Sequence, residues 1–152
     1  MDLGLTGKRA LVLSSSRGLG LGIAEALAGE GANVLLTGRT EDRLAEAVAA
    51  INARGQGTAA YVVSDLADDA VVDTLVSAVA KHLGGIDILV NNTGGPPPGR
   101  MIDAKLDGLT QHFTMMVQRV VELTARLVPQ MQAQKWGRII TIGSSGVIQP
   151  IP

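Results

Sequence analysis

A glycine-rich turn at residues 14–22 has the clearest chemical potential in this sequence. It reads Ser-Ser-Ser-Arg-Gly-Leu-Gly-Leu-Gly, between an apolar run that ends at Leu13 and an amphipathic stretch that begins at Ile23. A strand, a glycine-rich turn and a helix in this order direct backbone N–H groups and the positive end of the helix toward one point, which suits a phosphate. The Gly-Lys-Ser/Thr ending of a P-loop is missing, so serine hydroxyls replace its lysine as donors. The turn residues that we expect to bind a nucleotide are Ser14, Ser16, Arg17, Gly18, Leu19 and Gly20.

The elements that position this turn follow from the hydrophobic pattern, in which short apolar runs alternate with segments of helical period. Strands are expected at residues 9–13, 33–37, 58–63, 86–91 and 138–143. Helices are expected at residues 19–30, 41–53 and 68–83, with a long helix at 106–134. Repeated strand–helix–strand units need right-handed crossovers and form a parallel sheet with helices on both faces. The sequence therefore predicts one α/β domain over residues 1–152, a doubly wound, three-layer Rossmann-type fold with strand order 3-2-1-4-5, whose ligand lies at the carboxyl ends of the strands.

Two motifs in this pattern resemble those of the short-chain dehydrogenase/reductase family, and in particular its 3-oxoacyl-acyl-carrier-protein reductases. The family motif Thr-Gly-x-x-x-Gly-x-Gly matches residues 13–20 at Gly18 and Gly20, whereas Ser14 replaces its first glycine. The family motif Asn-Asn-Ala-Gly appears as Asn-Asn-Thr-Gly at residues 91–94, although an ordinary Asn-rich turn is the alternative there. The resemblance implies a dinucleotide cofactor that is also bound by Asn91, Thr93 and Gly94.

The resemblance also implies a place for the adenine base, after the third expected strand. Asp65 matches the family position that binds the adenine amino group, and Leu66 follows it. An N-cap for a helix that begins near Asp68 is the alternative role for Asp65.

The end of the second expected strand indicates which dinucleotide is bound. A carboxylate there would accept hydrogen bonds from the adenosine ribose and repel a 2′-phosphate. This sequence instead has Thr37-Gly38-Arg39, so Arg39 and Arg17 could pair with a phosphate dianion through their guanidinium groups. Two solvated surface arginines are the alternative. We expect NADP(H) in preference to NAD(H).

Ser144 is the candidate catalytic residue, because residues 137–144 resemble the fifth strand of the family and its catalytic serine. In that family a tyrosine donates the proton, a lysine lowers the pKa of the tyrosine, and an asparagine in the preceding long helix orders a water relay. Alignment of the long helix places Met116 at the asparagine position. Tyr61 belongs to the third strand and Lys135 precedes the serine, so neither fits its family role.

These residues together predict the cofactor half of an NADP(H)-dependent oxidoreductase that transfers hydride between nicotinamide and a carbonyl or alcohol substrate. Family members normally continue well beyond this length, so we expect a fold that is incomplete on its C-terminal side and a chain that binds nucleotide without turnover. The alternative is a non-catalytic nucleotide-binding or regulatory module, which Ser14, Met116 and the missing tyrosine and lysine favour.

Composition argues against several other function classes. The 152 residues carry 13 basic and 14 acidic side chains and only 2% aromatic residues, so nucleic acid is not an expected partner. The absence of cysteine excludes disulfides, thiolate metal sites and cysteine nucleophiles. The acidic residues are spaced as solvated helix faces, and no metal site is predicted. No apolar run approaches the length of a membrane span, so we expect a soluble cytoplasmic protein.

The long helix from Leu106 to Gln134 has an unusually broad apolar arc. Its apolar positions are Leu106, Leu109, Phe113, Met115, Val117, Val120, Val121, Leu127, Val128 and Met131. Such breadth predicts burial on more than one side of the helix. We therefore expect a homodimer or homotetramer that forms through this helix.

Overall fold

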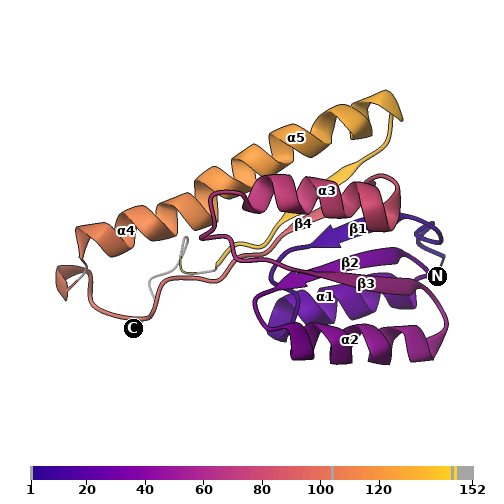
Figure 1. The fold of residues 1–152 in the computed structure, drawn as a ribbon, viewed down its shortest axis with the longest axis horizontal. Helices are drawn as coiled ribbons and strands as arrows, with labels where there is room; N and C mark the ends of the chain where they lie inside the picture. The colour runs from indigo at the N-terminus through magenta and orange to yellow at the C-terminus, as the bar shows by residue number, and fades with distance from the viewer. Residues whose placement is uncertain (1, 104, 145, 147–152) are drawn as a thin grey trace.

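The computed structural model describes residues 2–103, 105–144 and 146, and it contains one parallel sheet of five strands (Figure 1). The strands are β1 (Arg9–Val12), β2 (Asn33–Gly38), β3 (Thr58–Val63), β4 (Ile88–Asn91) and β5 (Arg138–Thr141). Their order is β3-β2-β1-β4-β5, and every neighbouring pair is parallel. The predicted fold class and strand order are confirmed.

Helices cover both faces of the sheet, as Figure 1 shows. Helices α1 (Gly18–Gly29) and α2 (Glu41–Arg54) lie on one face, and α3 (Val71–Leu83) and α5 (Arg119–Ala133) lie on the other. Successive residues of a strand point to opposite faces, so each inner strand contributes to two cores. In β1, Ala10 and Val12 belong to the core beneath α1 and α2, whereas Leu11 belongs to the core beneath α3 and α5.

The third helix begins later than expected, at Val71 instead of residue 68. The Asp65 Oδ1 atom accepts a hydrogen bond from the Ala67 N–H at 3.0 Å, and the Asp65 carbonyl accepts one from the Asp68 N–H at 3.0 Å. These bonds close a turn ahead of the helix, because an aspartate side chain satisfies nearby backbone donors readily. Ala70 is the N-cap residue of α3, so the alternative role of Asp65 as its N-cap is wrong.

The long helix predicted at residues 106–134 is interrupted. It consists of α4 (Leu106–Phe113), a π-helical turn η2 (Thr114–Gln118) and α5. The wider π turn changes the direction of the side chains that follow it. Leu123, Leu127 and Met131 of α5 are buried, but α4 contains no buried residue.

Within one copy of the chain, the described residues cover only one side of the long helix. The expected burial on more than one side therefore stays a prediction, which depends on association between copies. Leu106 is 75% exposed, Phe113 is 53% exposed and Val121 is 62% exposed. The last strand is similarly open, since Ile139 and Ile140 of β5 are 44% and 45% exposed.

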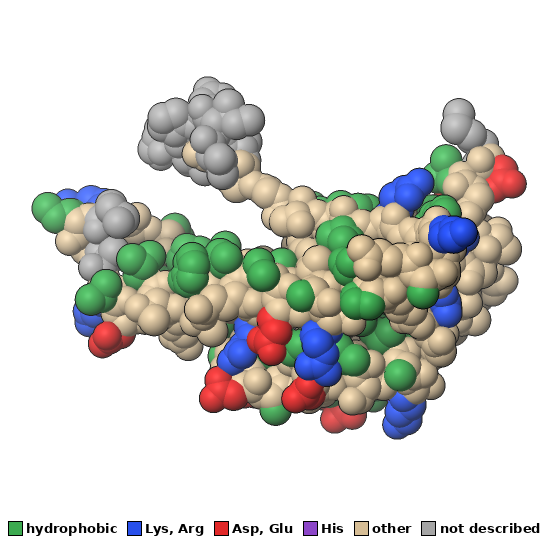
Figure 2. Space-filling view, turned by 90° about the horizontal axis from the view of Figure 1, so that it is seen from above, with side chains coloured by type: hydrophobic (Ala, Val, Ile, Leu, Met, Phe, Trp, Pro, Cys, Tyr) green, Lys and Arg blue, Asp and Glu red, His purple; other side chains and the backbone are tan. Residues whose placement is uncertain are grey.

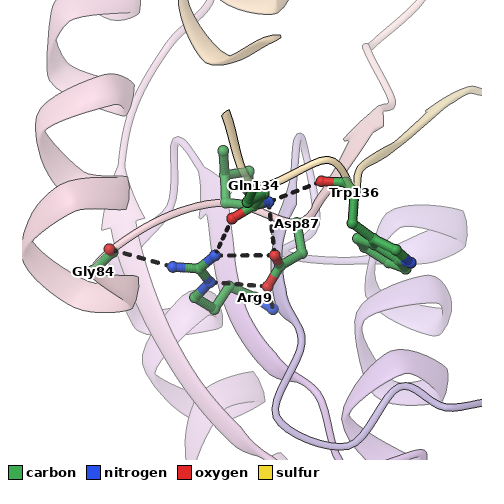
Figure 3. Close-up of polar contacts among 6 residues, drawn as sticks. Arg9, Gly84, Asp87, Gln134 and Trp136 are labelled. Atoms are coloured by element: carbon green, nitrogen blue, oxygen red, sulfur yellow. Dashed lines mark hydrogen bonds and ion pairs between the residues drawn. The ribbon is translucent and has the colours of Figure 1, made fainter. Parts of the chain in front are cut away.

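A polar cluster that the sequence did not reveal joins the amino ends of β1 and β4 to the end of α5 (Figure 3). The Arg9 guanidinium donates to both carboxylate oxygens of Asp87, at 2.9 and 3.0 Å, and to Gln134 Oε1 at 2.8 Å. Gln134 Nε2 donates in turn to Asp87 Oδ1 and to the Trp136 carbonyl, each at 2.9 Å. The hydrogen bond from Arg9 holds the pKa of Asp87 below its ordinary value, so the carboxylate stays charged although it is largely buried.

Candidate functional site

A cavity of about 470 Å³ lies at the carboxyl ends of the strands, opposite the Arg9–Asp87 cluster. Its wall comes from the β1–α1 turn, the ends of β2 and β3, the segment after β4, and the α4–η2 part of the long helix. The residues that line it are Ser14, Ser16, Arg17, Gly18, Thr37, Gly38, Arg39, Ser64, Asp65, Leu66, Asn92, Thr93, Gly94, Gly95, His112 and Met115. An open parallel sheet binds its ligands at such a position, where the strand order reverses beside the first strand.

Hydrogen bonds to β1 and β2 hold the glycine-rich turn in place. The Ser15 N–H donates to the Thr37 carbonyl at 2.8 Å, and the buried Ser15 hydroxyl donates to the Val12 carbonyl at 2.7 Å. The Ser14 N–H donates to Thr37 Oγ1 at 3.0 Å. Hydrogen bonds from both the backbone and the side chains thus hold the turn. Its other polar groups therefore keep a fixed orientation.

Asn92 holds the same turn from the other side, and sequence reasoning did not include it among the site residues. Its Nδ2 group donates to the carbonyls of Leu13 and Ser14, each at 3.2 Å. Its position within the Asn-Asn-Thr-Gly motif was the signal that could have identified it. Asn92 therefore couples β4 to the turn between β1 and α1.

Ser14, at the position of the family glycine, has a φ of 48°, in the left-handed region. A serine there is strained, since the left-handed conformation favours glycine. The backbone of the turn thus keeps a glycine-like conformation without the glycine, at a cost in stability.

Gly20 lies against the turn and does not line the cavity. A Cβ atom at Gly20 would lie 2.4 Å from the Ser14 carbonyl oxygen, 2.7 Å from Asn92 Nδ2 and 2.9 Å from Ser15 Cα. No side chain fits at that spacing, so the start of α1 can approach the turn this closely only with glycine at position 20.

The amino end of α1 can hold an anion beside this turn. The N-cap residue, Arg17, makes no side-chain hydrogen bond to the first turn of the helix, and the first turn contains no acidic residue. The first N–H groups of a helix have no partner within the helix, and its dipole is positive at that end. Gly18, the first residue of α1, lines the cavity together with Ser14 and Ser16, so this end of the helix lies at the cavity.

Two arginines supply further positive charge at the cavity. Arg17 and Arg39 both line it and are both exposed, and neither forms an ion pair with any residue that the structure describes. Between them, a Cβ atom at Gly38 would lie 3.0 Å from both Cβ and Oγ of Ser16. A carboxylate side chain at position 38 would therefore require Ser16 to move.

Not all of the sequence-predicted residues line the cavity. Those that do are Ser14, Ser16, Arg17, Gly18, Arg39, Asp65, Leu66, Thr93 and Gly94. Leu19 is 72% exposed outside it, and Asn91 is buried beneath it with Nδ2 3.5 Å from Thr124 Oγ1. The Asn91 Oδ1 atom is buried and accepts no hydrogen bond from the described residues.

None of Ser144, Met116 and Tyr61 lines the cavity. Ser144 follows β5, is exposed, and accepts a hydrogen bond from the Gly146 N–H at 3.1 Å. Met116 does not line the cavity, whereas its neighbour Met115 does. The hydroxyl of Tyr61, on β3, donates to Glu41 Oε1 at 3.2 Å, which raises the pKa of Tyr61.

The described residues form neither a metal site nor a helix that could cross a membrane. Across residues 2–103, 105–144 and 146, no three histidine, aspartate or glutamate side chains gather as metal ligands. In the same part of the chain, every helix is too short or too polar to cross a bilayer.

Known proteins resemble this chain in sequence and in fold. The family model for short chain dehydrogenases matches residues 8–152. A ketoacyl reductase of Nostoc sp. is 36% identical over 140 residues, which make up 92% of this chain and 48% of that protein.

Solved structures agree with the sequence comparison. L-sorbose reductase from Gluconobacter frateurii, complexed with NADPH and L-sorbose, matches with a TM-score of 0.93 and 37% identity, over 99% of this chain and 57% of that one. A 3-oxoacyl (acyl-carrier-protein) reductase from Agrobacterium tumefaciens with NADP bound has a TM-score of 0.88 and 34% identity, over 97% and 56% of the two chains. The chain spans about half the length of the curated relatives that it matches. The match over residues 8–152 and the shared fold show that this chain belongs to the short-chain dehydrogenase family.

Proposed function

We propose that this chain forms the dinucleotide-binding part of an NADP(H)-dependent oxidoreductase. The observation that carries the proposal is the cavity at the carboxyl ends of the strands, where the amino end of α1, Arg17 and Arg39 supply donors and positive charge. The NADPH and NADP in the two similar solved structures support the same cofactor class. When bound, such a cofactor accepts or supplies a hydride at its nicotinamide ring.

The hydrogen-bond donors and charged groups of the site match the successive parts of such a dinucleotide. The Ser14–Gly20 turn and the first N–H groups of α1 bind the pyrophosphate, and Arg17 and Arg39 bind the 2′-phosphate. Asp65 and Leu66 contact the adenine, and Thr93 and Gly94 continue the site along the end of β4. Asn91, buried at the end of β4, supports this edge, and Ser144 orients the carbonyl or alcohol group of a small-molecule substrate.

The preference for the phosphorylated cofactor is tested by titration of the purified protein with NADPH and with NADH. We expect tighter binding of NADPH. The Arg39→Ala variant should lose about 10- to 100-fold in NADPH affinity, because one or two charge-assisted hydrogen bonds are lost, and its NADH affinity should stay unchanged. Arg43→Ala is the matched control, since Arg43 is exposed on α2 and does not line the cavity. Equal affinity for both nucleotides, or an Arg39→Ala variant that binds NADPH as wild type does, would contradict the assignment.

A non-catalytic nucleotide-binding module is the second candidate function. It is favoured by Tyr61, which does not line the cavity and whose hydroxyl is bound to Glu41, and by methionine at position 116. Carbonyl reduction is measured with NADPH as the reductant, under conditions in which NADPH binding has been established. Turnover supports the oxidoreductase, whereas binding without turnover over a panel of ketones and aldehydes supports the module.

We also infer that two or four copies of the chain associate through the long helix. Apolar side chains lie exposed along it, as the green side chains in Figure 2 show. They are Leu106, Leu109, Phe113, Val117 and Val121, and burial of such a row is favourable. Light scattering should report an oligomer for the wild type and a smaller species for Val121→Glu, with Gln132→Glu as the control. A monomeric wild-type protein would refute this proposal.

A further inference from the structure

His112 lines the proposed dinucleotide site, yet none of the roles described above uses it. It extends from α4, and Met115 of the π turn lines the same cavity. Because the phosphate groups are assigned to the turn and the arginines, the imidazole is available for a different part of the ligand.

The hydrogen bond at one nitrogen fixes the chemistry of the other. His112 Nδ1 lies 2.6 Å from the Gly108 carbonyl oxygen, one helical turn earlier. A carbonyl oxygen only accepts, so Nδ1 carries the proton and donates it. In the neutral ring Nε2 then has a lone pair and acts as an acceptor, and it lies on the side of the ring that faces away from that carbonyl.

An ion pair shows which end of the cavity this helix lies beside. Arg119, one turn after Met115, donates from Nη2 to Asp69 Oδ1 at 2.6 Å. Asp69 belongs to the segment between β3 and α3, which also carries Asp65 and Leu66. The start of α5, directly after the π turn, is therefore bound to the loop after β3. The adenosine half of a dinucleotide lies toward the ends of β2 and β3 when its pyrophosphate lies at α1.

We propose that His112 is a specificity-determining residue for the purine base, with Nε2 accepting a hydrogen bond from the 6-amino group of adenine while Met115 packs against the ring. The proposal rests on the proposed dinucleotide function and adds to it a second acceptor besides Asp65. An amino group offers two hydrogens, one for each acceptor. A 6-oxo purine offers an oxygen at that place instead, which would meet the lone pair of Nε2 and the charge of Asp65.

The test compares NADPH with its hypoxanthine analogue, which differs by an oxygen in place of the 6-amino group. Wild-type protein should bind NADPH at least 10-fold more tightly than the analogue. His112→Asn keeps a donor near Nδ1 for Gly108 and removes the acceptor, so it should lose about 5- to 10-fold in NADPH affinity and little in affinity for the analogue. His112→Gln places an amide oxygen near the position of Nε2 and should keep the preference. Gln111→Ala, on the exposed side of α4, is the control.

The affinities measured in this test distinguish a failure of the proposed function from a failure of the role proposed for His112. If the wild type binds neither NADPH nor NADH, the proposed function fails and this inference fails with it. If the wild type binds NADPH but His112→Asn and His112→Gln keep the same ratio of the two affinities, only the role of His112 is overturned. An equal loss of affinity for both nucleotides in His112→Asn also overturns it, because that result indicates a general effect on the cavity.

Discussion

Replacement of Gly20 by alanine should both destabilise the fold and abolish nucleotide binding. The new Cβ atom would lie 2.4 Å from the Ser14 carbonyl oxygen and 2.7 Å from Asn92 Nδ2, well inside van der Waals contact. Relief of that overlap must separate α1 from the turn, at a cost of about 1–3 kcal/mol. It also weakens the hydrogen bonds from Asn92 to Leu13 and Ser14, each worth about 1 kcal/mol. The helix propensity of alanine returns about 0.5–1 kcal/mol, so the net loss should be about 2–3 kcal/mol.

Gly22→Ala is the matched control for this prediction. Gly22 lies in the same helix, and a Cβ atom there meets nothing within 4 Å. Its alanine variant should be more stable than wild type by about 0.5–1 kcal/mol, since only the propensity term remains. Urea denaturation gives both free energies, and titration with NADPH shows whether the turn still binds. If Gly20→Ala and Gly22→Ala unfold at the same urea concentration, the close approach of α1 to the turn does not exist in solution.

The remaining predictions concern the strained serine and the Arg9–Asp87 cluster. Ser14→Gly should raise the free energy of unfolding by about 0.5–1 kcal/mol, because relief of the left-handed strain at φ 48° exceeds the extra entropy of glycine in the unfolded chain; a less stable variant in urea would contradict this. Asp87→Asn should lower the free energy of unfolding at pH 7 by about 2 kcal/mol, since it leaves the partly buried Arg9 without its charged partner. The pKa of Asp87 is lowered in the folded state, so its contribution is complete above the unfolded pKa of about 4 and is lost as pH falls through the folded value. Wild-type stability should therefore fall more steeply than that of Asp87→Asn below about pH 4, and parallel pH profiles would refute the assignment.

The interruption of the long helix could not be predicted from the sequence. Its apolar spacing correctly indicated a helix from Leu106 onward, but period alone assumes a regular 3.6-residue turn. The π turn at Thr114–Gln118 breaks that period, and only the structure shows that Met115 lines the cavity while Met116 does not.

The residue at which α3 begins could not be predicted from the sequence either. Several residues after β3 could begin a helix, and the acidic ones there are good N-cap residues. The Asp65 side chain instead closes a turn with Ala67, so the helix starts at Val71. The Asp65 carboxylate could either cap a helix or close a turn, and the same sequence is compatible with both roles. The competition between these two hydrogen-bonding roles decides where α3 begins.

The sequence by itself determined where the strands, the glycine-rich turn and most of the cavity-lining residues lie along the chain, because these depend on local periodicity and on short motifs at strand ends. Its alternation of strands and helices also predicted the strand order, through the right-handed crossovers of a doubly wound sheet. Only the tertiary structure decided which distant groups hold that turn and the sheet. Asn92 reaches the carbonyls of Leu13 and Ser14, and Arg9 pairs with Asp87, each across more than 75 residues of sequence. Such contacts form only once parallel pairing has brought β1 and β4 side by side, and no local pattern specifies their geometry.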